Sequence, residues 1–348
     1  MREFEVSGKK FNDSTTPFLI AEIGHNHQGN LDTAISLIRA AAESGASAVK
    51  LQKRDNRNLF TRKGFEAPYE SENAFGSTYG EHREALEFGK DEYKVCIEES
   101  RRLGIDFFAT AFDFTSADFL MELDVSAFKI ASGDLKTTQL ISYVAKMGKP
   151  IILSTGGGEM EDIVRAVDAA TSVNSNVAVL QCTAGYPPSF DELNLRVIET
   201  LRKEFTDVTV GYSGHDSGIA MALVAYVLGA RVIEKHFTLN RAMKGTDHAF
   251  SLEPQGMAKL SRDLQRCHLA MGDGIKRPYD SEKGPLVKMG KSVYFASDFN
   301  DGHVLGVGDL ALKSPALGLP PYLLDQLIGK ALVRNVSKDE LVSWTDLN

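Results

Sequence analysis

The feature that most constrains this chain is a regular alternation between short apolar runs and longer amphipathic segments. The runs are rich in β-branched and aromatic residues, as buried strands are. Eight of them occur: Phe18–Ile23, Ala48–Gln52, Asp106–Thr110, Ala127–Ala131, Pro150–Ser154, Val177–Gln181, Val208–Tyr212 and Arg231–His236. This pattern predicts an α/β fold, a (β/α)8 TIM barrel, with a doubly wound open sheet as the alternative.

The segments between these runs have the apolar spacing of amphipathic helices. They are Leu31–Ser44, Lys90–Leu103, Ser116–Leu123, Thr138–Lys146, Glu159–Ala170, Asn194–Glu204 and Ser217–Leu228. Several end in a glycine that can close the helix in a left-handed conformation, namely Gly45, Gly104, Gly148 and Gly229. Ahead of the first run, Phe4–Phe11 with Ser7-Gly8 at its centre predicts a β-hairpin at the bottom of the barrel.

The length of 348 residues suits a large barrel with a small appendage. We assign residues 1–272 to the barrel, because the last helical pattern ends near residue 272. Residues 273–286 mix Gly, Pro, Lys and Asp without periodicity, which is typical of a linker. Residues 287–348 predict a small β-rich domain with three strand-like runs, Lys291–Ala296, Leu310–Lys313 and Ala331–Val336.

Composition and charge argue against several classes of protein. The formal net charge is −8 and no basic run with interleaved aromatic residues occurs, so we expect no nucleic-acid partner. No apolar run is long enough for a signal-peptide core or a membrane span, and we therefore expect a cytoplasmic protein without membrane association. The three cysteines, Cys96, Cys182 and Cys267, form no C-x-x-C pair and indicate neither a disulfide framework nor a structural zinc cluster.

Polar residues at the carboxyl ends of the predicted strands are the candidates for chemistry, because barrel active sites form there. Lys50 and Lys129 lie within apolar runs, where an ammonium group is unfavourable unless an anion accompanies it. Ser132, Ser154 and Ser213 follow strand ends and offer hydroxyl donors. Together these residues predict a phosphate or carboxylate site, whereas one such lysine alone would more simply reach solvent.

Two histidines come from neighbouring strands of a closed barrel, His215 after the seventh run and His236 at the end of the eighth. Two imidazoles with water or substrate oxygens suit Mn²⁺, Fe²⁺, Co²⁺ or Zn²⁺, and the alternative is a hydrogen-bonded pair without a metal. Glu234 shares a strand face with His236, and Gln52 shares one with Lys50, so both pairs can point inward.

Two polar loops flank these strands. Residues 22–30 follow the first run and are dense in polar side chains. The alternative to a functional loop is a polar loop in which Asn30 caps the next helix and His25 and His27 are surface residues. Residues 244–248 follow the eighth run, and there Asp247 either binds sugar hydroxyls or caps a turn.

Seven segments together resemble the sialic acid synthase family, which includes N-acetylneuraminate synthase and N-acetylneuraminate-9-phosphate synthase. The segments are residues 21–29, 48–52, 128–134, 152–156, 180–187, 211–215 and 233–238. The resemblance covers nearly the whole chain. It implies a TIM barrel followed by a small antifreeze-like (SAF) domain, and a domain-swapped homodimer in which that domain covers the other subunit's active site.

The resemblance also implies an activity. Members of the family condense phosphoenolpyruvate with N-acetylmannosamine, its 6-phosphate or a related N-acylated amino sugar, giving an N-acylneuraminate-type nonulosonic acid and phosphate. The implied cofactor is Mn²⁺ or another divalent metal such as Mg²⁺ or Co²⁺, which polarises the acceptor aldehyde.

Residue roles carried over from the family fall into four groups. Phosphoenolpyruvate is implied to contact Lys50, Thr110, Lys129, Ser132, Ser154 and Ser213. The metal is implied to bind His215 and His236. Proton transfer and stabilisation of positive charge fall to Glu22 and Glu234, and contacts with the acceptor sugar to Gln52, Tyr186 and Asp247.

The chain departs from the family pattern at two positions. Ser314 stands where many bacterial members have an arginine that reaches the other subunit's sugar site, and Ala184 stands where many have an asparagine. The segment 68–83 resembles an insertion in animal-type members that use the 6-phosphate, although some bacterial members share it. The alternatives are another 3-deoxy-2-ulosonate synthase acting on an aldose phosphate, and a non-catalytic scaffold for polysaccharide assembly.

Overall fold

The computed structural model describes residues 2–348, and the chain divides after Gly272 into two compact units. Eight parallel strands close into a barrel in the first unit, so the TIM-barrel prediction is confirmed and the open sheet is excluded. The strands are β3 (Phe18–Gly24), β4 (Ala48–Lys53), β5 (Asp106–Ala111), β6 (Phe128–Ile130), β7 (Ile151–Ser154), β8 (Val177–Cys182), β9 (Thr209–Gly214) and β10 (Val232–His236). Each lies within two residues of the predicted run at either end.

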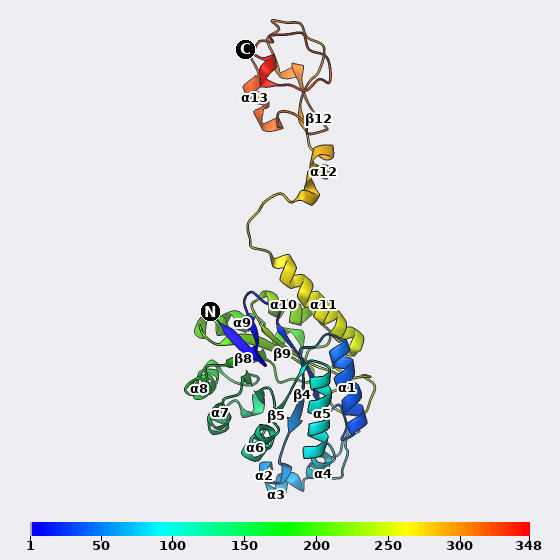
Figure 1. Ribbon diagram of the computed structural model, residues 1–348, viewed down its shortest axis with the longest axis vertical. Helices are drawn as coiled ribbons and strands as arrows, with labels where there is room; N and C mark the ends of the chain where they lie inside the picture. Colours follow the sequence, from blue (N-terminus) through cyan, green and yellow to red (C-terminus); the bar gives the residue numbers. More distant parts are fainter. Residues whose placement is uncertain (1) are drawn as a thin grey trace. The chain divides into compact units, whose positions relative to one another are not determined.

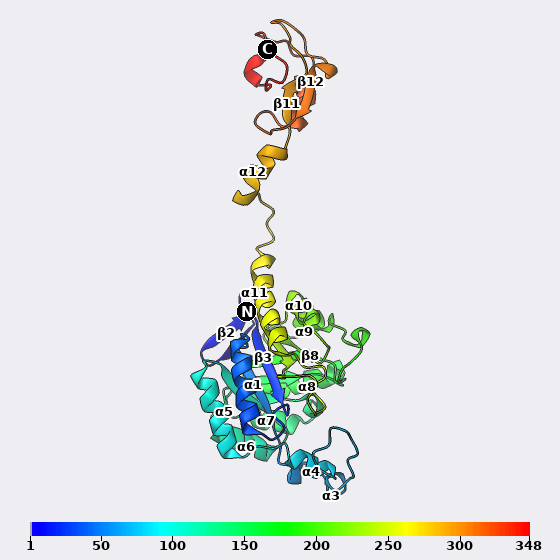
Figure 2. The same cartoon turned by 90° about the vertical axis from the view of Figure 1, so that its right-hand side faces the viewer.

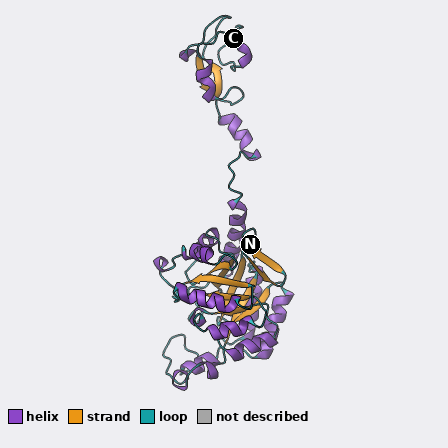
Figure 3. Ribbon diagram, turned by 90° about the vertical axis from the view of Figure 1, so that its left-hand side faces the viewer, coloured by secondary structure: helices purple, strands orange, loops and turns teal. Residues whose placement is uncertain are grey.

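Helices surround the strands of the barrel unit, as Figure 1 and Figure 3 show. They are α1 (Leu31–Glu43), α5 (Lys90–Arg102), α6 (Phe114–Glu122), α7 (Thr138–Ala145), α8 (Met160–Thr171), α9 (Val197–Glu204), α10 (Ala220–Val227) and α11 (Pro254–Met271). The Asn30 side chain accepts a hydrogen bond from the Thr33 amide (2.8 Å), which confirms the predicted N-cap of α1. The four predicted C-terminal glycines all have positive φ, between 74° and 107°.

The predicted hairpin is present ahead of the barrel. Strands β1 (Glu3–Val6) and β2 (Lys9–Asn12) pair in antiparallel fashion across Ser7 and Gly8, both of which have positive φ. The aromatic rings of Phe4 and Phe11 lie 6.3 Å and 4.9 Å from that of Phe18 at the start of β3. The hairpin therefore packs against the amino ends of the strands.

A helical excursion between β4 and α5 was not predicted from the sequence. It contains the short helices α2 (Asn56–Leu59), α3 (Arg62–Phe65) and α4 (Tyr79–Glu84). Figures 1 and 2 place it at the end of the barrel away from the hairpin. The excursion thus lies on the side where the carboxyl ends of the strands emerge.

The second unit is small and has its own apolar core. It contains α12 (Asp280–Met289), β11 (Ser292–Phe295), β12 (Leu310–Lys313) and α13 (Leu324–Leu327). Helix α12 overlaps the stretch predicted to be a linker, 273–286. The third predicted strand, Ala331–Val336, is wrong, because this segment makes only single bridges, to Val304, Leu347 and Phe299 in turn, and no continuous ladder. Across residues 2–348, no helix has the length and apolar character needed to span a membrane.

Candidate active site

A cavity of about 490 Å³ opens at the carboxyl ends of the barrel strands. The strand register brings its polar residues into a ring, because Glu22 on β3 pairs with Lys50 on β4 and with His236 on β10. In the same way Thr110 on β5 pairs with Lys129 on β6. Residues far apart in the sequence therefore become neighbours at one level of the barrel.

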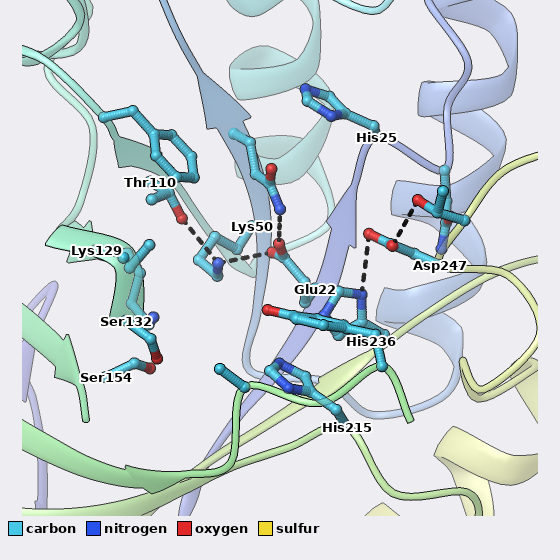
Figure 4. Close-up of a pocket in the computed structure, with 18 of the residues that line it drawn as sticks. Glu22, His25, Lys50, Thr110, Lys129, Ser132, Ser154, His215, His236 and Asp247 are labelled. Carbon is cyan, nitrogen blue, oxygen red and sulfur yellow. Dashed lines mark hydrogen bonds and ion pairs between the residues drawn. The ribbon is translucent and has the colours of Figure 1, made fainter. Parts of the chain in front are cut away.

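The residues assigned above to catalysis, substrate and metal line this one cavity. Figure 4 labels several of them, among them Glu22, Lys50 and His215. The set is Glu22, Lys50, Gln52, Thr110, Lys129, Ser132, Ser154, Tyr186, Ser213, His215, Glu234, His236 and Asp247. Their placement satisfies the geometric requirement for a common site, while their individual roles stay predictions.

The base of the cavity holds two lysines and two glutamates, all at most 4% exposed. Lys50 Nζ lies 2.9 Å from Glu22 Oε2 and 3.6 Å from Glu234 Oε1, and it donates a hydrogen bond to Thr110 Oγ1 (2.9 Å). Lys129 Nζ lies 3.9 Å from Glu234 Oε1. Mutual pairing offsets the large cost of burying these charges. The group is neutral when both glutamates are ionised and carries one positive charge when Glu22 is protonated.

The pKa values of the Glu22 and Glu234 carboxyl groups are shifted in opposite directions. Burial raises the pKa of the Glu22 carboxyl above its ordinary value, and Lys50 offsets the rise only in part. Burial acts on Glu234 as well, but Lys129 and Lys50 outweigh it and lower the pKa of Glu234 to about 2. Glu234 therefore remains the counterion of Lys50 when Glu22 is protonated. A pair of carboxyls with opposite pKa shifts is typical of acid–base sites.

A bulge in β3 shapes the position of Glu22. The register with β4 shifts between Glu22 and Gly24, and Gly24 has a φ of 54°. A Cβ atom at Gly24 would lie 3.1 Å from Glu22 Oε1 and 3.2 Å from Gln52 Nε2, which donates a hydrogen bond to that same oxygen (2.8 Å). The positive φ favours glycine here, and a larger residue would also displace the side chains of Glu22 and Gln52.

Hydroxyl groups stand beside the lysines. Ser213 Oγ donates to Glu234 Oε1 (3.1 Å), and Ser132 Oγ accepts from the Gly156 amide (3.0 Å). Ser154 Oγ is buried without a hydrogen-bond partner among residues 2–348. Buried hydroxyls normally have partners, so an unsatisfied one facing a cavity indicates a ligand or water position.

His215 and His236 lie side by side at the cavity wall, with ring centroids 5.2 Å apart. The Thr183 carbonyl accepts a hydrogen bond from His215 Nδ1 (2.9 Å), which leaves Nε2 with its lone pair free. His236 Nδ1 is buried without a hydrogen-bond partner in the described chain, 3.7 Å from Asp247 Oδ2. Burial lowers the pKa of His215 to about 3 and that of His236 to about 4, so both rings are neutral.

This pair fits a divalent metal, since neutral imidazoles are metal ligands and one is oriented by a backbone carbonyl. Within residues 2–348 no group of three or more His, Cys, Asp or Glu side chains is arranged around a common metal position. A cation at the two histidines would consequently take its remaining ligands from water or substrate.

The opening of the cavity carries Tyr186 and Asp247. The Tyr186 ring stacks on His215 at 4.2 Å between centroids and is 56% exposed, so most of its surface remains available to a ligand. Asp247 accepts a hydrogen bond from the Thr246 hydroxyl (2.9 Å). Its carboxylate faces His236 and the cavity, as Figure 4 shows.

Two arginines that line the cavity were missed in the sequence. Arg54 lies two residues after Gln52 and directly follows the end of β4, so extending the alternation of Lys50 and Gln52 one step past the strand would have found it. Arg83 lies in the irregular excursion, where no periodicity marks it.

The interpretation of His25 and His27 as surface residues is wrong. The His25 side chain is 10% exposed and lines the cavity between the two arginines. His27 is 2% exposed and stacks on Phe88 with ring centroids 4.1 Å apart. Nearby aromatic and cationic side chains from the chain after β4 bury both rings.

Comparison with known proteins gives consistent matches over nearly the whole length. Residues 37–276 match the NeuB family and residues 290–348 match the SAF domain. Human N-acetylneuraminate-9-phosphate synthase is 39% identical over 93% of this chain and 91% of its own length. The N,N'-diacetyllegionaminic acid synthase of Campylobacter jejuni is 38% identical over 93% of this chain and 98% of its own.

A solved structure supports the same relationship. The N-acetylneuraminic acid synthetase of Leptospira borgpetersenii, in complex with citrate, superposes with a TM-score of 0.72 at 32% identity. The match covers 82% of this chain and 95% of that one.

Proposed function

The chain belongs to the NeuB family of nonulosonic acid synthases, and from this premise we propose that it joins phosphoenolpyruvate to an open-chain N-acylated amino sugar. The products are an N-acylneuraminate-type nonulosonic acid and inorganic phosphate. The observation that carries the proposal is the single cavity in which Lys50, Lys129, Glu22 and Glu234 meet the neutral pair His215 and His236.

Phosphoenolpyruvate binds on the lysine side of the cavity in this proposal. Lys50 and Lys129 supply positive charge, and the hydroxyls of Ser132, Ser154 and Ser213 supply hydrogen bonds to phosphate and carboxylate oxygens. Ser154 Oγ, which lacks a partner in the described chain, gains one when the anion binds. Thr110 holds Lys50 through its hydrogen bond and so positions the ammonium group.

The reaction forms one carbon–carbon bond and breaks one carbon–oxygen bond. The π electrons of phosphoenolpyruvate form the bond from C3 to the acceptor carbonyl carbon, and the carbonyl oxygen takes a proton from Glu22, whose raised pKa favours the acid form. Water adds to the electron-poor C2 and gives one proton to ionised Glu234. The C2–O bond to phosphate then breaks, the remaining proton leaves with the phosphate, and a 2-keto acid results.

His215 and His236 would hold a divalent metal, Mn²⁺ or alternatively Mg²⁺ or Co²⁺, which supplies Lewis acidity toward the acceptor carbonyl when bound. Gln52, Tyr186 and Asp247 orient the acceptor sugar at the cavity opening. Correct orientation of the two reactants accounts for a large part of the rate in bimolecular reactions of this kind.

Phosphate release tests the proposal. Purified full-length protein with Mn²⁺ is expected to release inorganic phosphate from phosphoenolpyruvate only when an N-acylmannosamine-type sugar is added. Mass spectrometry of the product then identifies the acceptor, and chelation followed by addition of each metal ranks the cofactors. Two results would overturn the proposal. One is release of inorganic phosphate with an aldose phosphate as acceptor but not with any amino sugar; the other is no release with any acceptor.

The assembly and location that the family resemblance suggests are also proposals. We infer a domain-swapped homodimer in a reducing cytoplasm, supported by the SAF match and by three unpaired cysteines within the described chain. Sedimentation of the full chain checks the dimer.

At the position of the family's small-domain arginine, Ser314 Oγ instead donates to the Met289 carbonyl (3.2 Å).

A further inference from the structure

A second group of cationic side chains lines the same cavity. Arg54 is 8% exposed and Arg83 is half-buried, and both direct a guanidinium nitrogen at the ring of His25. The distance is 3.3 Å from Arg54 Nη1 to His25 Nε2, and 3.4 Å from Arg83 Nη1 to His25 Nδ1. Figure 4 places His25 on a different side of Glu22 from Lys129, Ser132 and Ser154.

His25 cannot satisfy both arginines. Burial lowers the pKa of His25 well below its ordinary value, with Arg54 and Arg83 adding to the effect, so the ring is neutral. A neutral imidazole has one N–H group and one acceptor nitrogen. Since guanidinium groups only donate, at least one of the two N–H groups that face His25 lacks an acceptor.

The positive charge of Arg54 and Arg83 is compensated only in part. The other acceptors are neutral, because Arg54 donates to the Gln52 amide oxygen (2.8 Å) and Arg83 donates twice to the Tyr79 phenol (3.0 and 2.8 Å). Neither guanidinium forms an ion pair with a carboxylate in the described part of the chain. The nearby Glu87 carboxylate pairs with Lys53 through Oε2 at 2.9 Å. Its other oxygen, Oε1, lies 3.8 Å from His25 Nε2, so Glu87 offsets part of the charge of Arg54.

The contrast with the lysine side is informative. Lys50 and Lys129 face Glu22 and Glu234 at 2.9–3.9 Å, whereas two buried or half-buried guanidiniums face a neutral ring. A buried cation without a counterion is strongly unfavourable unless a ligand supplies the opposite charge. The charge on Arg54 and Arg83 therefore indicates a position for a second anion in the cavity, separate from the one expected at the lysines.

We propose that Arg54 and Arg83 form a subsite for a phosphomonoester carried by the acceptor sugar, at the end of that sugar remote from its reacting carbonyl. This inference rests on the proposed function and names the substrate class of the same site. Two guanidiniums match the oxygens of a phosphate group well. Gln52 places the subsite on the acceptor side, because its amide bonds both Arg54 and Glu22.

The test compares an N-acylmannosamine 6-phosphate with the same sugar lacking phosphate. Wild-type enzyme is expected to prefer the phosphorylated sugar in kcat/KM. In Arg83→Gln this preference falls by about 30-fold or more, because one of two charged contacts to the phosphate is lost. Arg83→Lys restores part of it. The matched control is Arg62→Gln, since Arg62 is 90% exposed in the same excursion and pairs with Glu66; it keeps the wild-type preference.

The outcomes separate the subsite from the reaction. An unchanged preference in Arg83→Gln, or a rise in KM for phosphoenolpyruvate alone, would overturn the subsite and leave the synthase reaction standing. If no acceptor supports phosphate release, the proposed function fails. Calorimetric binding of the two sugars to wild type and Arg83→Gln then decides the subsite on its own, with equal affinity for both sugars in wild type counting against it.

Discussion

The two ends of the barrel are built from the same strands but are filled in opposite ways. At the amino end, aromatic rings pack against one another, with centroids 4.9 Å apart for Phe11 and Phe18 and 6.4 Å for Phe18 and Phe108. At the carboxyl end, the strands hold paired charges and neutral imidazoles around a cavity of about 490 Å³. One end buries apolar surface, and the other keeps buried polar groups available.

Unsatisfied atoms show what this difference means. Three buried polar atoms at the cavity lack hydrogen-bond partners within residues 2–348: Ser154 Oγ, Glu234 Oε2 and His236 Nδ1. Each costs free energy in the absence of a ligand. The carboxyl end is therefore organised for binding and chemistry, and the amino end supplies stability that offsets this cost, as in other barrels of this type.

The largest expected effect concerns the carboxyl end. His236→Ala should reduce turnover in the phosphate-release assay by about 10²–10³-fold or more. The variant lacks one of the two imidazoles proposed to hold the metal that stabilises negative charge on the acceptor carbonyl oxygen. The thermal unfolding midpoint should stay near that of wild type, since His236 Nδ1 makes no hydrogen bond in the described chain. His268→Ala is the control, as His268 contacts Tyr226 on α10 outside the cavity and should leave turnover intact. Undiminished turnover in His236→Ala would remove this residue from the proposed chemistry.

The opposite effect is expected at the amino end. Phe18→Ala should lower the free energy of unfolding by about 3–5 kcal/mol, because a fully buried ring between Phe4, Phe11 and Phe108 is lost. Denaturant titration measures the change, and Phe18→Leu, which keeps most of the volume, should lose much less. The kcat of the folded fraction should be retained. A fall in kcat as large as that of His236→Ala would show that the two ends are not separable.

The smallest effect concerns a charge beside the cavity. Burial raises the pKa of Asp134, just after β6, to about 6, so the folded state holds this proton more tightly than the unfolded chain does. The contribution of Asp134 to the free energy of unfolding is therefore fully present below pH 4 and is lost as the pH rises through 6. Asp134→Asn should therefore be more stable than wild type at pH 8, by about 1 kcal/mol or less after solvent screening, and nearly equal to it at pH 4. A constant difference at both pH values would exclude an ionisation effect.

Much of the fold followed from the sequence because each barrel strand is a compact apolar run. Part of the site could be predicted for a related reason. Lys50, Lys129 and Glu234 are charged residues inside such runs, and an inward position at the cavity gives each of them a partner of opposite charge. Family resemblance added Tyr186 and favoured the sugar-binding alternative for Asp247; both residues lie in loops, which have no periodic signal.

The features that could not be predicted from the sequence depend on contacts between segments that are distant along the chain. His25 and His27 become buried only because residues 54–88 fold over them. The segment Ala331–Val336 has strand-like composition, but its backbone bridges three different segments. Short helices such as α2 and α3 have too few residues for an amphipathic period to be visible.

Because β10 pairs with β3 to close the barrel, the pocket cannot form until β10 has been synthesised. Glu22 emerges among the first residues of the chain, and its neighbour His236 emerges more than two hundred residues later. A nascent polypeptide released before residue 232 would leave β3 and β9 as open sheet edges, prone to associate with other chains. Such a truncated product would hold Lys50 and Lys129 without Glu234, and would therefore be an aggregation risk rather than a partially active enzyme.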